Sequence, residues 1–187
     1  MTFEESLIEY CSPTLAGIKV ASLYRFFPED RMQFAHQYKF WRNQLSRRGL
    51  NLLILNGCPK TSSYLLYLFR ENDLRQTLSS PETCSYLASL GYDVVDSSQG
   101  LVRQIIQRLC LQADFPHEIG LFLGYPLEDV KGFIQNRGAA YTSFGCWKSY
   151  GDPQEARRCF SSYQACTSLY KRCYTDGVPI TRLIVAA

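Results

Sequence analysis

The segment from residue 115 to residue 134, FPHEIGLFLGYPLEDVKGFI, contains the densest set of residues that could do chemistry. It holds His117, one of two histidines in the sequence, followed directly by Glu118. Imidazole titrates near neutral pH, so His117 could serve as an acid–base group or a metal ligand. The structural alternative is that both residues lie in the first turn of a helix, where the helix dipole favours a carboxylate. Both interpretations stay open at this level.

Cysteine is the second reactive residue type, with eight in the sequence. Cys159, Cys166 and Cys173 recur every seven residues, with Tyr163 and Tyr170 between them. On a helix this spacing makes one stripe, but successive thiols are about 10 Å apart along the axis. That separation is too long for a shared zinc ion or a disulfide. The stripe therefore predicts a buried, unreactive helix face, and without CxxC, HxxxH or HExxH we expect no metal site.

Two other cysteines have basic residues near them in the sequence. Cys11 begins the block CSPTLAGIK, which ends at Lys19, and Cys146 is followed by Trp147 and Lys148. A cation close to a thiol lowers its pKa and favours the reactive thiolate. These positions are therefore candidates for a nucleophile or for an anion-binding group.

Composition narrows the class of protein. A length of 187 residues predicts a single domain, residues 1–187, with a substantial core. The formal net charge of +3 is too small to indicate nucleic acid, and no apolar run is long enough to span a bilayer. The acidic N-terminal sequence does not resemble a signal peptide, so we expect a cytoplasmic protein with free thiols.

The candidate residues must be positioned by helices and strands that are grouped along the chain rather than strictly alternating. This order favours an α+β fold: one domain with a small, mainly antiparallel sheet packed with several helices. Apolar runs predict strands at 17–26, 50–55, 63–70, 141–150 and 181–186. Periodicity and capping signals predict helices at 2–10, 29–47, 71–79, 82–90, 97–112 and 153–174.

Residues 115–136 are predicted to form a helical corner of two short helices. Pro116 starts the first helix, Gly124 ends it in left-handed geometry, and Pro126 starts the second. The pattern also fits a DNA-binding helix-turn-helix over residues 117–136. However, Glu128 and Asp129 would then face phosphate at the start of the reading helix, which argues against nucleic acid.

Three blocks together resemble one family: residues 11–19, residues 115–134 and WKSYGD at 147–152. The sequence is similar to the family called domain of unknown function 3793. The resemblance implies a cytosolic, stand-alone domain of anaerobic bacteria, associated with flavodoxin and iron handling, without an assigned activity. Cys146 is not a constant feature of the family pattern, so the resemblance favours the other candidate residues. These are Cys11, Lys19, His117, Glu118, Tyr125, Trp147 and Lys148.

The first functional hypothesis is a ligand- or partner-binding accessory protein in anaerobic redox or metal metabolism. It would take a small anionic or planar ligand, or a redox protein such as a flavodoxin, and no cofactor follows from the residues. The alternative is a small enzyme with Cys11, His117 or Glu118 as catalytic groups, and with Lys19 or Lys148 holding an anionic substrate. DNA binding comes third.

A ligand site also makes a geometric prediction. We expect Lys19, His117 and Trp147 to converge within about 10–12 Å, the breadth of a small-molecule pocket. The ligand-binding candidates are Lys19, Tyr125, Trp147 and Lys148.

Overall fold

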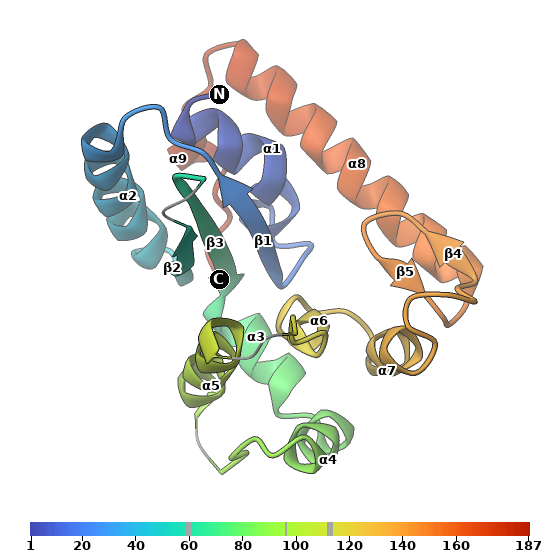
Figure 1. Cartoon of the computed structure of the whole chain (residues 1–187). Helices are drawn as coiled ribbons and strands as arrows, with labels where there is room; N and C mark the ends of the chain where they lie inside the picture. Colours follow the sequence, from blue (N-terminus) through green and yellow to red (C-terminus); the bar gives the residue numbers. More distant parts are fainter. Residues whose placement is uncertain (59–60, 96, 112–113) are drawn as a thin grey trace. The chain divides into compact units, whose positions relative to one another are not determined.

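The computed structural model describes residues 1–58, 61–95, 97–111 and 114–187 (Figure 1). The chain divides into two compact units. Unit 1 consists of Met1–Asp73 and Ala165–Ala187, and unit 2 consists of Leu74–Gln164. Helices and a small antiparallel sheet confirm the predicted α+β class. The prediction of one domain over residues 1–187 stays a prediction.

Unit 1 is built on three antiparallel strands in the order β1-β3-β2. These are β1 (Ala21–Phe26), β2 (Leu50–Cys58) and β3 (Ser63–Arg70). Strands β2 and β3 pair antiparallel and lie where the apolar runs at 50–55 and 63–70 predicted strands. Alternate side chains of each strand point to the same face, so Tyr24, Leu52 and Leu66 enter one core.

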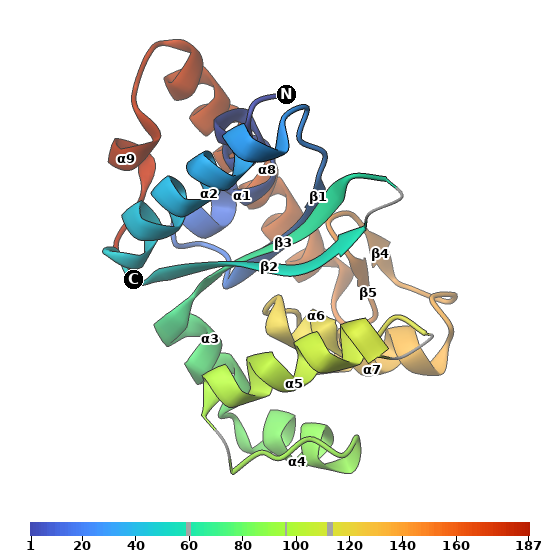
Figure 2. The ribbon, with the colours of Figure 1, turned by 60° about the vertical axis from the view of Figure 1, so that its left-hand side comes forward.

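Helices α1 (Phe3–Leu15) and α2 (Arg31–Ser46) cover the same face of this sheet, as Figure 2 shows. A capping box of Thr2 and Glu5 starts α1, and the Asp30 carboxylate accepts hydrogen bonds from the first-turn amides of α2. Buried Phe34, Trp41 and other apolar side chains of α2 then fix which side of that helix faces the sheet.

Two predictions in unit 1 were wrong. The first helix does not stop at residue 10: it continues through Pro13 to Leu15, because residues 11–15 are all buried in the core. Residues 181–186 do not form a strand. A short helix α9 (Ile180–Leu183) precedes an extended segment whose carbonyls at 185 and 186 accept hydrogen bonds from Arg70. Side-chain donors there replace the strand ladder that the apolar pattern indicated.

Unit 2 is mainly helical. The helices are α3 (Glu71–Leu78), which starts at the end of unit 1, α4 (Pro81–Ser89), α5 (Ser98–Leu111), α6 (Ile119–Phe122), α7 (Leu127–Gln135) and the first part of α8 (Pro153–Thr175). The predicted corner is confirmed as α6 and α7, with Gly124 in left-handed geometry at φ 78°. The predicted strand 141–150 is instead a tight hairpin, β4 (Ser143–Phe144) and β5 (Lys148–Ser149), beside α7 (Figure 1).

Candidate functional site

A continuous series of ring and cation–π contacts, centred on half-buried Phe133, brings His117 and Lys148 together on unit 2. We call the set Phe115, His117, Phe133, Tyr141, Phe144 and Lys148 the aromatic patch. The His117 ring meets Phe133 edge-on, with 4.9 Å between ring centroids, and Lys148 Nζ lies 5.9 Å from the same Phe133 ring. Two of the seven candidate residues therefore share one neighbour, contributed by α7.

The outer part of the aromatic patch is open to solvent. Phe144 exposes 68 % of its surface, and Phe115 and Tyr141 are also exposed. Lys148 Nζ lies 5.1 Å from the Tyr141 ring centroid, and the Tyr141 and Phe144 rings are 6.0 Å apart. Exposed apolar groups gathered in this way are typical of surfaces that bind partners.

Lys148 is held in place rather than extended into solvent. Its Nζ donates a hydrogen bond of 2.7 Å to the carbonyl of Gly138, just after the end of α7. The ammonium group therefore supports the hairpin and completes the aromatic patch through two cation–π contacts. It is half-buried, so an anionic substrate would have to compete with these contacts.

The polar residues around the hairpin converge on a buried carboxylate, that of Asp129. Its oxygens accept hydrogen bonds from Trp147 Nε1 (2.7 Å), Ser149 Oγ (3.1 Å) and the amides of Tyr150 (2.5 Å) and Gly151 (3.0 Å). A buried carboxylate needs such donors, because it has left water. We call this arrangement the Asp129 clamp. It joins the first turn of α7 to β5 and to the residues after that strand.

Trp147 and Tyr125 are half-buried and packed against each other and against α8. Their rings stack with centroids 4.6 Å apart, and Trp147 meets Phe160 of α8 edge-on at the same distance. Burial, with a smaller contribution from Cys146, raises the pKa of Tyr125 to about 12. Gly120 allows the close helix crossing beneath, since a Cβ there would lie 2.7 Å from Val130 Cγ2. A ligand-binding role for Trp147 and Tyr125 would require this stack to open.

Glu118 has a structural environment too. It is buried, and its Oε1 accepts a hydrogen bond of 3.0 Å from the Tyr92 hydroxyl and one of 3.4 Å from Arg108 Nη1. The Arg108 guanidinium also lies 4.0 Å from the Tyr92 ring centroid. Burial, followed by the charge of Glu118, raises the pKa of Tyr92. Glu118 thus ties α6 to α5 through Arg108 rather than pairing with its sequence neighbour His117.

Cys11 and Lys19 belong to unit 1. Cys11 is fully buried, and this burial raises the pKa of its thiol to about 12, although the charge of Lys19 acts in the opposite direction. At neutral pH the group is a protonated thiol, which is a poor nucleophile. His117 and Trp147 belong to unit 2, so the expected convergence with Lys19 involves both units and stays a prediction.

The cysteine stripe of α8 is less buried than its spacing indicated. Tyr170 is buried, whereas Cys159, Cys166 and Cys173 are half-buried. Within the described ranges, no group of three His, Cys, Asp or Glu side chains could hold a metal ion. Nor does any helix in those ranges have the length and apolar character needed to cross a membrane.

Sequence reasoning missed the two residues that organise this region. Asp129 had been considered only as a charge that would face DNA phosphate, yet it is buried and therefore absent from the exposed surface of α7. Phe133, the ring shared by His117 and Lys148, was not among the candidate residues. No local signal identifies either role, because the partners lie up to 22 residues away in sequence.

Fold and site together describe an α+β protein with a helical corner clamped to a β-hairpin through a buried carboxylate. The model of the family described as "Protein of unknown function (DUF3793)" matches residues 7–184. The chain belongs to this family, as its three sequence blocks suggested. No curated protein and no solved structure matches the chain.

Proposed function

We propose that the protein is a partner-binding accessory protein and that the aromatic patch of unit 2 is its docking surface. The observation that carries this proposal is the unbroken series of ring and cation–π contacts from Phe115 to Phe144 through His117, Phe133 and Lys148. Aromatic side chains offer large contact areas at low entropic cost, which is why they are enriched at protein interfaces.

A protein partner suits the aromatic patch better than a reaction does. Catalysis needs a nucleophile or base with a free, activated atom, whereas Cys11 is buried with a raised pKa and Glu118 is engaged by Tyr92 and Arg108. His117 is exposed but is packed against Phe133. Unit 1 has two surface pockets, one lined by residues that include Glu29 and Gln33 and the other by residues that include Glu9 and Lys171. None of the seven candidate residues lines either pocket.

The partner chemistry that we test first is a redox protein of the flavodoxin class, which the family resemblance implies. Holo-flavodoxin from the same organism would be titrated into the protein by isothermal calorimetry, with free flavin mononucleotide in a parallel titration. We expect saturable binding of the flavodoxin and no binding of the free flavin. Binding of free flavin alone would support the ligand-binding version of the hypothesis instead.

Two variants and a control connect binding to the aromatic patch. Phe144→Ser and His117→Ala should each weaken flavodoxin binding about tenfold or more while the melting temperature stays nearly unchanged, since hot-spot side chains commonly contribute 1–2 kcal/mol. Val95→Ser removes an exposed apolar side chain from the segment between α4 and α5 of unit 2 and serves as the matched control. The proposal is wrong if no flavodoxin binds, or if all three variants bind as the wild type does.

A further inference from the structure

Helix α2 in unit 1 has a strongly basic exposed face. Between Asp30 and Glu71 the sequence contains no aspartate or glutamate. The basic residues of α2 and of the two positions after its end are Arg31, Lys39, Arg42, Arg47 and Arg48. In a chain whose formal net charge is only +3, this is an unusual local excess of positive charge.

None of these five cations forms an ion pair with a carboxylate in the described part of the chain, but their other contacts differ. Arg31 donates a hydrogen bond to Ser62 Oγ and Arg48 donates one to the carbonyl of Ile184. By contrast, Lys39, Arg42 and Arg47 are exposed, and no acidic side chain in the described part of the chain forms an ion pair with them. These three groups can therefore engage an external anion without breaking an ion pair to a described residue.

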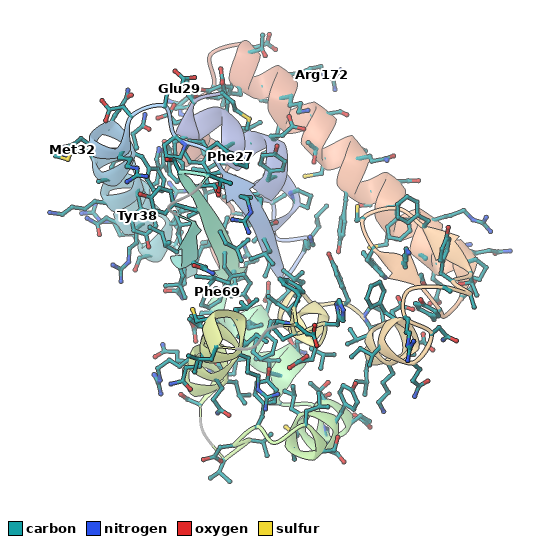
Figure 3. The ribbon with its side chains drawn as sticks, viewed as in Figure 1. Phe27, Glu29, Met32, Tyr38, Phe69 and Arg172 are labelled. Carbon is teal, nitrogen blue, oxygen red and sulfur yellow. The ribbon has the colours of Figure 1, made fainter. Side chains whose placement is uncertain are left out.

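Exposed apolar side chains lie among the cations. Met32 exposes 70 % of its surface and projects from α2 away from the sheet (Figure 3), and Phe40 exposes 51 %. Neither can turn into the core, because the opposite side of the helix is fixed there by buried Phe34, Trp41 and Leu45. The two side chains therefore add exposed apolar surface to the basic face of α2.

The combination of residues identifies the kind of occupant. Arginine binds carboxylates through paired hydrogen bonds, and methionine, arginine and aromatic residues are enriched at protein interfaces. A phosphate backbone would offer Met32 no apolar partner. The main apolar face of α2, with Phe34, Trp41 and Leu45, is already packed in the core, so the helix does not offer a bilayer the broad apolar face by which amphipathic helices bind membranes. Met32 and Phe40 lie about 80° apart around the helix axis, close enough to enter one apolar patch on a protein.

We infer that the face of α2 formed by Met32, Lys39, Phe40, Arg42 and Arg47 docks a second protein, one that presents carboxylates around an apolar patch. This surface lies in unit 1, so it is separate from the aromatic patch of unit 2 and does not depend on the function proposed for it. The carboxylates would pair with the three cations, and the apolar patch would receive Met32 and Phe40.

The test uses a defined acidic probe and the full chain. A fluorescein-labelled peptide of Glu-Glu-Leu repeats would be titrated by fluorescence anisotropy at low and at physiological salt. We expect saturable binding that weakens about tenfold in the variant K39Q/R42Q/R47Q, a typical effect of losing interface charges, and also in M32S/F40S. The matched control R157Q/R158Q/R172Q removes the same charge from exposed positions of α8 and should bind as the wild type does.

Parallel probes decide between occupants. Single-stranded DNA of the same formal charge should bind more weakly than the peptide and should be insensitive to M32S/F40S. Equimolar phosphatidylcholine–phosphatidylserine vesicles should not co-sediment the protein. Tighter binding of DNA, co-sedimentation that α2 variants abolish, self-association through the same residues, or peptide binding that the α2 variants leave unchanged would each overturn the inference.

Discussion

The Asp129 clamp of unit 2 and the exposed face of α2 in unit 1 use charge in opposite ways. At the clamp, a carboxylate is buried and meets four donors, two of them main-chain amides. On α2, Lys39, Arg42 and Arg47 are exposed and form no ion pair with a described residue. The polar groups around Asp129 therefore have a structural role, because a buried charge needs several hydrogen-bond partners. The open cations occur in a helix without any recognisable motif.

The largest effect on stability is expected from a substitution of Asp129. Asp129→Ala leaves the Trp147 indole, the Ser149 hydroxyl and two amides without their acceptor, so we expect a loss of about 3 kcal/mol or more in the free energy of unfolding. Urea denaturation followed by tryptophan fluorescence measures it. Glu128→Gln, exposed in the same helical turn, should cost less than about 1 kcal/mol. Equal effects of the two variants would show that the clamp does not stabilise the fold.

A smaller loss of stability is expected when a methyl group is added at Gly132, next to Tyr150 of the Asp129 clamp. Glycine to alanine in a helix normally stabilises by about 0.5–1 kcal/mol. Here the new Cβ would lie 2.4 Å from Tyr150 Cγ, so we expect the sign to reverse, with a cost of about 1–3 kcal/mol from overpacking. Thermal denaturation of Gly132→Ala, alone and combined with Tyr150→Ala, tests this. The cost should shrink in the double variant, and a stabilised single variant would contradict the close approach of Tyr150 to α7.

The cysteine thiols allow the same comparison between buried and exposed groups. Folding raises the pKa of Cys11 from 9.0 to about 12, so the folded state holds this proton more tightly than the unfolded state does. Its contribution to stability is therefore complete below about pH 9 and is lost as the pH rises towards 12. Cys11→Ala should flatten that part of the stability–pH curve.

Labelling gives an independent check of the same thiol. Iodoacetamide at pH 8 should modify the exposed Cys110 and Cys146 well before Cys11, as mass mapping would show. The half-buried cysteines of α8 should react at intermediate rates. Early modification of Cys11 in the folded protein would restore it as a catalytic candidate.

The smallest effect is expected on α2. Because Lys39, Arg42 and Arg47 form no ion pair with a described residue, K39Q/R42Q/R47Q should change the free energy of unfolding by less than about 0.5 kcal/mol per site. Chemical denaturation beside R157Q/R158Q/R172Q measures the difference. A loss comparable to that of Asp129→Ala would mean that the cations of α2 are structural, and the contrast between the two regions would disappear.

Much of the fold could be predicted, because the signals are local. The capping residue Asp30, the apolar runs of β2 and β3 and the spacing along α8 act within a few residues, and the corresponding elements lie where they were expected. The failures occurred where distant groups overrode local preference. Core packing carried α1 past Pro13, and Arg70 took the carbonyls that a strand at 181–186 would have paired.

The candidate site was less predictable. Sequence named His117 and Lys148 but not Phe133, the ring that joins them. It also named Glu118, Trp147 and Tyr125, whose present surroundings are mainly structural. Residue types indicate what chemistry a side chain can do, whereas its burial and its partners determine whether the reactive atom is available.

The sequence by itself determined the α+β class, the position of most helices and the two central strands, the left-handed turn at Gly124 and the family. All of these follow from periodicity, caps and turns, which depend on neighbouring residues. Only the tertiary structure decided that Asp129 is enclosed by donors from the hairpin while Lys39 and Arg42 stay open. Hydrogen-bond partners and solvent exposure depend on residues far apart in the chain, so helical or strand periodicity does not predict them.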